Sequence, residues 1–389
     1  MTENRDCAET DVCPSTDPLF REFSVRSLHL RNRIVMSPMT RTHSPGGVPG
    51  DKVARYYRRR AEGGTGLIIT EGVAIDHPAS VDHARVPNMF ASTALDGWRS
   101  VVDGVHEAGG RIIPQLWHVG PLWGAMGGSP AITPMRPSGL WGTPGITTYS
   151  DEYVKASEPV TRAMTTADIK SVISAFRAAA RSAVNAGFDG IALHGGHGYL
   201  LDAFLWADTN RRTDEWGGDA ERRAAFPAAV VRAIREEIGE DLPIFFRFSQ
   251  HKQQDFGARL ADTPEELRAL LRPLVAAGVD VLDASARRFQ APAFEGSDLS
   301  LAGWAKQLTG APAMAVGSVG IGSAIKDRRS SGNPVLDNRE ELLRRLDTEE
   351  FDLIAIGRLH LADPDLVQTL RAGRPLPHYD YVLHESDLV

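Results

Sequence analysis

Two histidines and a tyrosine lie close together in a segment that is rich in glycine. His194, His197 and Tyr199 belong to the run His-Gly-Gly-His-Gly-Tyr. In such a turn both imidazoles can point at one small atom and donate hydrogen bonds to a carbonyl or phenolate oxygen, and the tyrosine can supply a proton nearby. A metal pair is disfavoured because no third ligand follows at a plausible spacing, so we expect no metal site. A purely structural turn with hydrogen-bonded histidines remains open.

A single arginine interrupts an apolar run. Arg247 has phenylalanine on both sides, in the run 245–248, so we expect its side chain to be buried. A buried arginine requires an anionic or acceptor partner. An anionic cofactor ring or a phosphate would serve, and so would an ion pair with a neighbouring carboxylate such as Glu71 or Asp283.

Two neighbouring segments near the C-terminus suit a phosphate group. Gly317 and Ser318 follow one apolar run, and Gly357 and Arg358 follow the next. Backbone N–H groups and a guanidinium can both bind a phosphoryl dianion. Glycine at both positions, together with arginine, therefore predicts a phosphate site.

The run that ends near residue 117 offers an amide and an indole. The side chain of Gln115 can both donate and accept hydrogen bonds, which suits a pyrimidine-like edge. Trp117 would form an apolar wall beside it, although plain core packing also explains this residue.

Eight apolar runs must position these side chains. They cover residues 32–37, 66–71, 111–117, 188–194, 243–249, 279–284, 312–317 and 352–357, with helical patterns between them. Continuous apolar runs of this length are typical of parallel strands covered on both faces. Their alternation with helices fits an α/β fold, either a (β/α)8 (TIM) barrel or a doubly wound sheet.

The position of polar residues favours the barrel. Active sites of (β/α)8 barrels lie at the carboxyl ends of the strands, and polar side chains occur there all the way round. They are Thr40, Glu71, Gln115, His118, His194, His197, Arg247, Ser318 and Arg358.

The chain has 389 residues, more than the about 250 that a barrel needs. We expect a disordered leader over residues 1–18 and a single barrel domain over 19–389. The largest insertion is the segment 120–165 after the third strand, rich in Gly, Pro, Trp and Ser, and a loop of this length predicts a substrate lid. A second long loop covers residues 321–338.

Composition and charge disfavour several classes. The net charge of −7 and the absence of a long basic run give no support to nucleic-acid binding. No apolar window approaches 18 uncharged residues and the first residues are polar, so we expect neither a membrane span nor a secretory signal. The two cysteines, Cys7 and Cys13, suggest free thiols rather than a disulfide framework. Together these features lead us to expect a cytoplasmic protein.

These residues together indicate a flat, phosphorylated cofactor with an amide-like edge, a description that FMN meets. Here the chain resembles the old yellow enzyme family of FMN-dependent NAD(P)H oxidoreductases. The resemblance rests on motifs in family order between residues 20 and 373: NRIVMSPMTR (32–41), TEG (70–72), QLWHVG (115–120), AGFDGIALHGGHGYLLDAFL (186–205), NRRTDEWGG (210–218) and IGRLHLADPDL (356–366).

The resemblance implies a role for each matching residue. The flavin ring would be contacted by Pro38, Met39, Thr40, Gly72, Gln115 and Arg247, with Thr40 near flavin O4 and Arg247 beside N1 and O2. The phosphate would be held by Gly317, Ser318, Gly357 and Arg358. The substrate's carbonyl oxygen would lie at His194 and His197, Tyr199 would donate a proton, and Trp117 would shape the pocket.

The resemblance also implies an activity. FMN would bind tightly without a covalent bond, NADPH or NADH would reduce it, and a small enone-type substrate would then be reduced at its C=C bond in a ping-pong cycle, by a monomer or homodimer. A flavin-dependent desaturase or oxidase, or a dehydrogenase, acting on a specialised metabolite with the same site remains an alternative. Members with an iron–sulfur cluster are disfavoured because a cluster needs about four cysteines and none follows Cys13.

The sequence departs from the family pattern at two places, and two other classes of protein were considered. The loop after Ser318 is longer than in compact members, and Arg222 stands where asparagine is common. An aldolase-type barrel would require a lysine at a strand end, and only Lys252 lies close to one. A binding protein without catalysis would lack one of the groups named above, and all of them are present.

Overall fold

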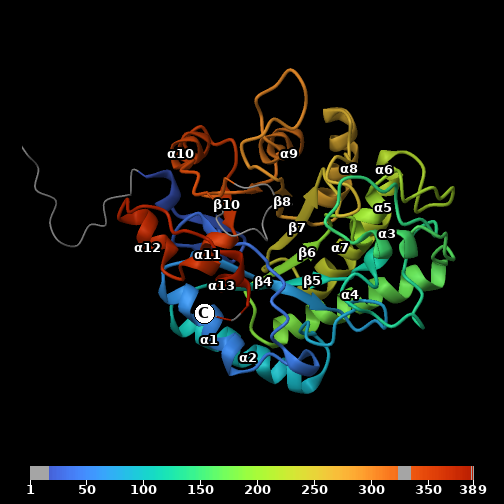
Figure 1. Cartoon of the computed structure of the whole chain (residues 1–389), viewed down its shortest axis with the longest axis horizontal. Coiled ribbons are helices and arrows are strands. Elements are labelled where there is room, and N and C mark those ends of the chain that lie inside the picture. The colour runs from blue at the N-terminus through green and yellow to red at the C-terminus, as the bar shows by residue number, and fades with distance from the viewer. Residues whose placement is uncertain (1–16, 323–333, 387, 389) are drawn as a thin grey trace, which may run out of the picture.

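A closed barrel of parallel strands forms the centre of the computed structural model, which describes residues 17–322, 334–386 and 388. Within these residues the barrel has eight strands, in the order β10-β3-β4-β5-β6-β7-β8-β9, and every neighbouring pair is parallel (Figure 1). The strands are β3 (Ile34–Met36), β4 (Leu67–Ala74), β5 (Ile112–Trp117), β6 (Ile191–His194), β7 (Ile244–Ser249), β8 (Val281–Ser285), β9 (Ala313–Val316) and β10 (Leu353–Ile356). Each overlaps one predicted apolar run, so the expected (β/α)8 fold is confirmed.

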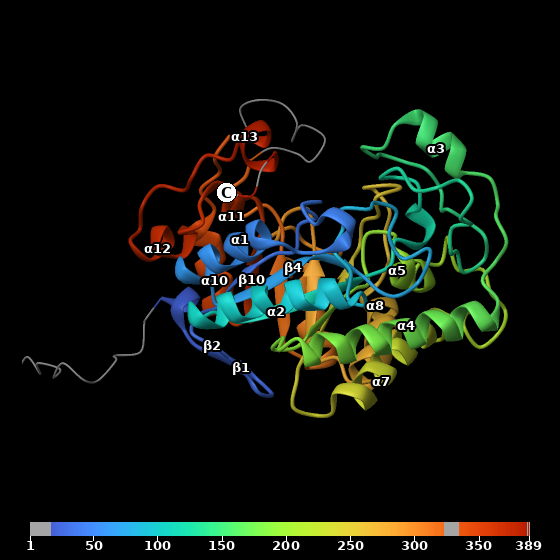
Figure 2. The ribbon, with the colours of Figure 1, turned by 90° about the horizontal axis from the view of Figure 1, so that it is seen from below.

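Helices cover the outside of the barrel (Figures 1 and 2). The longer ones are α1 (Asp51–Glu62), α2 (Ser92–Glu107), α4 (Thr166–Asn185), α7 (Ala225–Ile238), α8 (Pro264–Ala276), α9 (Leu301–Thr309) and α10 (Arg339–Asp347). The shorter ones are α5 (Leu200–Leu205), α6 (Ala220–Arg223), α11 (Arg358–Ala362), α12 (Leu366–Arg371) and α13 (Tyr381–Glu385). In α4, Thr165 and Asp168 form a reciprocal capping box, and Ile169, Val172 and Phe176 are buried on one face.

A short hairpin closes the amino-terminal end of the barrel. Strands β1 (Phe23–Val25) and β2 (Leu28–Leu30) pair antiparallel. Leu28 and Leu30 are buried in the same cluster as the inward-facing barrel residues Val35, Leu67 and Phe245. Figure 2 shows this hairpin at the opposite end of the molecule from α13. The interior is therefore a packed core, and the end that carries the polar residues is the one open to ligands.

Of the long segments expected from the sequence, the structure describes the segment 120–165 but only the ends of the loop 321–338. The segment 120–165 contains the 3-10 helix η3 (Gly120–Leu122) and the helix α3 (Asp151–Ser157). Figure 2 places α3 at the same end of the barrel as α13, and the function of this segment as a lid stays a prediction. Most of the loop 321–338 and residues 1–16, with both cysteines, lie outside the described residues.

The division into a leader over 1–18 and one domain over 19–389 stays a prediction. The first described element is the 3-10 helix η1 (Pro18–Phe20), which Asp17 caps by accepting from the backbone N–H of Leu19. Another 3-10 turn, η2 (Pro45–Gly47), follows β3. In the described part of the chain, no helix has the length and apolar character needed to cross a membrane.

Candidate active site

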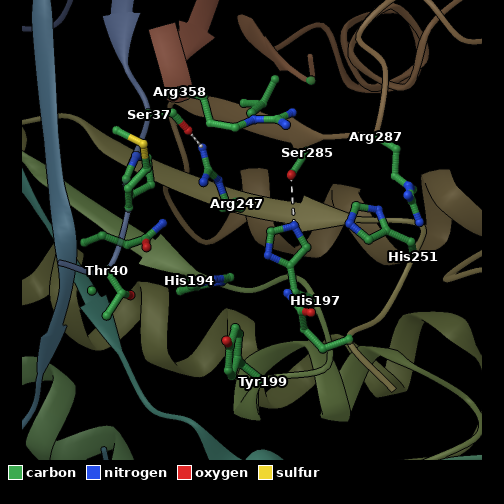
Figure 3. Close-up of a pocket in the computed structure, with 18 of the residues that line it drawn as sticks. Ser37, Thr40, His194, His197, Tyr199, Arg247, His251, Ser285, Arg287 and Arg358 are labelled. Carbon is green, nitrogen blue, oxygen red and sulfur yellow. Dashed lines mark hydrogen bonds between the residues drawn. The ribbon is translucent and has the colours of Figure 1, made fainter. Parts of the chain in front are cut away.

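A cavity of about 630 Å³ opens at the carboxyl ends of the barrel strands, a size typical of organic-ligand sites. Its lining includes every residue to which the family resemblance gave a role, namely Pro38, Met39, Thr40, Gly72, Gln115, Trp117, His194, His197, Tyr199, Arg247, Gly317, Ser318, Gly357 and Arg358. These residues are spread over more than three hundred positions of the sequence, and the barrel topology brings them to one place (Figure 3). Their individual roles stay predictions.

An aromatic cluster surrounds the two histidines. His194 ends β6, and its ring centroid lies 4.6 Å from that of Tyr199 and 5.1 Å from that of His197. Trp117, at the end of β5, packs edge-on against Tyr199 with the ring centroids 5.0 Å apart. Two potential hydrogen-bond donors and a phenol therefore share one wall of the cavity, with an indole beside them, as Figure 3 shows for the three labelled side chains.

The backbone of the histidine turn is held by hydroxyl groups. His197 adopts a left-handed φ of 64°, which a residue other than glycine adopts only when its surroundings hold it there. Its N–H donates to Ser249 Oγ at 2.8 Å, and its Nε2 lies 2.9 Å from Ser285 Oγ. These contacts come from β7 and β8, so two neighbouring strands fix the orientation of the His197 ring.

Both imidazoles are neutral at neutral pH. Burial, reinforced by the charge of Arg247, holds the pKa of His194 well below its usual range. Burial likewise lowers the pKa of His197, with smaller contributions from His251 and other neighbouring groups. A neutral imidazole carries one N–H donor. If the hydroxyl of Ser285 donates to Nε2 of His197, the ring proton is on Nδ1 and can be donated to a ligand.

A buried ion pair lies beneath the same turn. Lys252 Nζ is 2.8 Å from Asp202 Oδ2, and both side chains are 0% exposed. Asp202 also accepts from the N–H of Gly198 at 2.6 Å, and Lys252 also donates to the carbonyl oxygen of Ser249 at 3.1 Å. The lysine nearest to a strand end is thus committed to a structural contact, which disfavours the aldolase-type reading.

The partner of Arg247 is Asp283, one of the two carboxylates considered from the sequence. Arg247 Nε lies 2.7 Å from Asp283 Oδ2, and its Nη2 donates to Asp283 Oδ1 and Ser37 Oγ, each at 3.2 Å. The ion pair bridges adjacent strands β7 and β8. Asp283 therefore balances the charge of the buried Arg247, and a contact between Arg247 and the flavin stays a prediction.

Glu71, the other carboxylate, has a different position. Its Oε2 accepts from the backbone N–H groups of Arg41 at 2.8 Å and Thr42 at 3.2 Å, and it is buried outside the cavity lining. It therefore shapes the segment that follows β3 and carries Thr40. Burial raises the pKa of Glu71 to about 7, against the lowering effect of these two hydrogen bonds.

Glu71→Gln should change how stability depends on pH. The folded protein binds this proton more tightly than the unfolded chain, because the pKa rises from 4.5 to about 7. The free energy of unfolding should therefore fall as pH rises through this window, by at most about 3 kcal/mol. Urea unfolding at several pH values should show a flatter profile for Glu71→Gln than for the wild type or the exposed control Glu215→Gln. Equal slopes in all three proteins would contradict this assignment.

The lining of the cavity includes an amide group without a partner for one of its donors. Gln115 is 2% exposed, and its Nε2 has no hydrogen-bond partner within the described structure. Buried donors of this kind require an acceptor, which the carbonyl groups of a flavin would supply. Gly72 has a packing role here, because a Cβ at that position would lie 2.4 Å from Cε3 of Trp117. This glycine therefore lets the indole lie against β4.

Another part of the cavity lining has the character of an anion site. Ser318 follows Gly317 directly after β9 and adopts a left-handed φ of 46°. Its Oγ accepts from Arg358 Nη2 at 3.2 Å. Gly317 permits close backbone contact, since a Cβ there would lie 2.5 Å from the carbonyl oxygen of Ala286. A guanidinium and a glycine-flanked backbone together fit a phosphate. The residues present thus match FMN at both its amide edge and its phosphate.

Arg358→Met should weaken FMN binding by about 10- to 100-fold, the loss expected for hydrogen bonds to a charged group. Titration of flavin-free protein, followed by quenching of FMN fluorescence, measures this directly. Arg374→Met is the matched control, because Arg374 donates to Thr369 Oγ1 and lies outside the cavity lining. Unchanged affinity in Arg358→Met would remove this residue from the phosphate site.

Sequence reasoning missed several lining residues. His251 and Arg287 follow β7 and β8, and Tyr381 and Glu385 come from α13. The first two also lie at carboxyl ends of strands, a position that could have identified them. His118, in contrast, was expected at this face but lies behind it, where its Nδ1 accepts from the N–H of Gly120.

Comparison with known proteins identifies the family. The family model described as NADH:flavin oxidoreductase / NADH oxidase family matches residues 18–377. The chain belongs to this family. It is therefore an FMN oxidoreductase of the old yellow enzyme family, with NAD(P)H as the reductant.

Individual relatives agree with this assignment. The flavin oxidoreductase hxnT of Emericella nidulans is 33% identical, with 94% of this chain and 93% of the relative covered. The 12-oxophytodienoate reductase 1 of Oryza sativa subsp. japonica is 31% identical, with 93% and 88% covered. A structure of morphinone reductase in complex with tetrahydroNAD is 28% identical with a TM-score of 0.77, covering 95% of this chain and 97% of that one.

Proposed function

We propose that this protein is an ene-reductase, which uses NAD(P)H to reduce the C=C bond of small α,β-unsaturated carbonyl compounds. The observation that carries the proposal is the cluster of His194, His197 and Tyr199 on one wall of a cavity whose other groups fit FMN. A donor pair beside a proton donor is the arrangement that conjugate reduction of an enone requires.

His194 and His197 would bind the carbonyl oxygen of the substrate. As the alkene accepts a hydride, negative charge moves onto this oxygen, and donors already in place stabilise it. Preorganised donors of this kind each contribute roughly 3 kcal/mol to transition-state stabilisation. Burial keeps both rings neutral, so they act as hydrogen-bond donors throughout, without gaining or losing a proton.

Tyr199 would complete the reduction. FMN, which Gln115, Arg247 and Arg358 would help to hold, would supply hydride-transfer chemistry at the β carbon of the substrate. The Tyr199 hydroxyl then gives a proton to the α carbon, so that one hydride and one proton saturate the bond. Trp117 packs edge-on against Tyr199 and would hold the phenol toward the substrate.

Two names among the relatives support this chemistry. A 12-oxophytodienoate reductase and a morphinone reductase are similar to this chain over most of its length. We extend to this chain only the class of reaction. The predicted contacts of the FMN-binding residues, and a monomer or homodimer, belong to the same proposal.

Anaerobic stopped-flow absorbance tests it. NADH and NADPH are each mixed with the purified yellow protein, and loss of flavin absorbance reports reduction. The reduced protein is then mixed with cyclohexenone or a longer enone, and return of the absorbance together with the saturated ketone confirms the activity. Reoxidation by oxygen alone, with every enone left unchanged, would exclude an ene-reductase and favour the oxidase alternative.

A further inference from the structure

One end of the cavity is cationic and has no part in the reaction described above. Beyond His197, on the side away from His194, the wall is formed by His251, Phe256 and Arg287. The His251 ring centroid lies 5.0 Å from that of His197, and Figure 3 shows His251 and Arg287 together at this end. A ligand whose oxygen is held at the histidine pair could therefore reach this wall with another part of its structure.

Arg287 differs from Arg247 in how its charge is balanced. Arg247 pairs with Asp283, whereas the guanidinium of Arg287 contacts the Phe256 ring, with 4.7 Å from Cζ to the ring centroid. Arg287 makes no ion pair or hydrogen bond with the described part of the chain. The aromatic face fixes its position, but it leaves the forked N–H groups available to a ligand.

The groups around Arg287 do not neutralise it. Lys252, next to His251, is already balanced by Asp202, and the neighbouring Arg288 adds further positive charge. Burial lowers the pKa of Arg287, and the charge of Arg288 lowers it further, which is the effect of a partly desolvated cation beside another cation. His251 is 9% exposed, and burial lowers its pKa to about 3, so it is a neutral group that can donate one hydrogen bond.

We propose that Arg287, with His251, forms a subsite for an anionic oxygen group on the molecule that occupies the cavity. A guanidinium fork matches the planar geometry of a carboxylate or the oxygens of a phosphate. Two sources carry such a group: a carboxylate on the organic substrate, and a phosphate of the nicotinamide coenzyme. We assign the carboxylate, which would make the substrates enones that carry an acid. This assignment rests on the proposed function, because it places the substrate's carbonyl oxygen at His194 and His197.

Equilibrium binding tests the subsite without turnover. Levulinate and its longer methyl-ketone homologues cannot be reduced at an alkene, and their methyl esters lack the charge. Calorimetric titration of the FMN-loaded protein should show tighter binding of the acid than of the ester at the best chain length. In Arg287→Met this preference should fall about tenfold, as expected for loss of a hydrogen bond to a charged group. Arg287→Lys should recover part of it.

Arg288→Met is the matched control. It removes the same charge one position away, from a side chain outside the cavity lining, and should keep the acid preference. Equal acid and ester binding in the wild type, or equal losses in Arg287→Met and Arg288→Met, would overturn the subsite. Thermal unfolding of each variant establishes that it is folded.

Flavin reduction by NADH and NADPH distinguishes the two sources of the anion. We expect the concentration dependence of both reactions to be the same in Arg287→Met and the wild type. Weaker coenzyme binding together with an unchanged acid preference would overturn the assignment to the substrate. Reduction of cyclohexenone by the wild type reports on the proposed function separately, so an intact acid preference without enone reduction would reject that function and leave the subsite standing.

Discussion

Replacing Tyr199 with phenylalanine is expected to slow enone reduction by about 100- to 10,000-fold, the contribution typical of general acid catalysis. The change removes one hydroxyl group and keeps the ring. The contacts of that ring with His194 and Trp117, at centroid distances of 4.6 Å and 5.0 Å, should therefore survive. Reduction of the flavin by NAD(P)H does not use the phenol, so that half-reaction should keep a rate close to that of the wild type.

Stopped-flow measurement of the two half-reactions separates these effects. Deuterium at the α carbon of the product, from reaction in D2O, would confirm that this proton comes from an exchangeable group. Tyr153→Phe is the control, because it also removes a phenol. Tyr153 is not among the residues that line the cavity, and its hydroxyl donates to the carbonyl oxygen of Leu122 at 2.9 Å. If Tyr199→Phe reduced enones as fast as the wild type, Tyr199 would not be the donor.

The barrel and most of the site could be predicted because their signals are local. A strand covered on both faces must be apolar along its length, as in the run around Phe245 and Phe246. Each strand can therefore be recognised from a short apolar run in the sequence. A polar residue that follows such a run must lie at the carboxyl end of the strand. The polar site residues were found by this rule, whereas Pro38, Met39 and Gly72 were assigned only through the family resemblance. His251 and Arg287 obey the rule as well.

Contacts between distant elements could not be predicted in this way. From the sequence, either Glu71 or Asp283 could have been the partner of Arg247. Only the register of β7 against β8 places Asp283 opposite it. The hairpin of β1 and β2 has strands of three residues each, too short for a periodic pattern. Tyr381 and Glu385 line the cavity because α13 packs over the barrel end, where Glu385 pairs with Arg41, and no local feature of the C-terminus indicates this.

The buried ion pair beneath the histidine turn links stability to the site. Lys252→Met should destabilise the protein by about 3–5 kcal/mol, because it leaves the carboxylate of Asp202 buried without a countercharge. Asp202 also holds the N–H of Gly198, and Lys252 forms an isolated bridge with His197. Losing the pair should therefore displace the His197 backbone as well, and any folded variant should bind enones less tightly than the wild type.

Urea unfolding and a double-mutant cycle measure this coupling. Asp202→Asn removes the charge and keeps the shape, so the double variant with Lys252→Met should be more stable than Lys252→Met alone, as expected for two residues in contact. Lys306→Met is the matched control. Lys306 pairs with Asp352, but its side chain is 28% exposed, and an ion pair near solvent contributes only about 0–1 kcal/mol to stability. Additive effects of the Lys252 and Asp202 substitutions would show that the two charges do not stabilise each other, and the turn would then depend on its hydroxyl contacts with Ser249 and Ser285 alone.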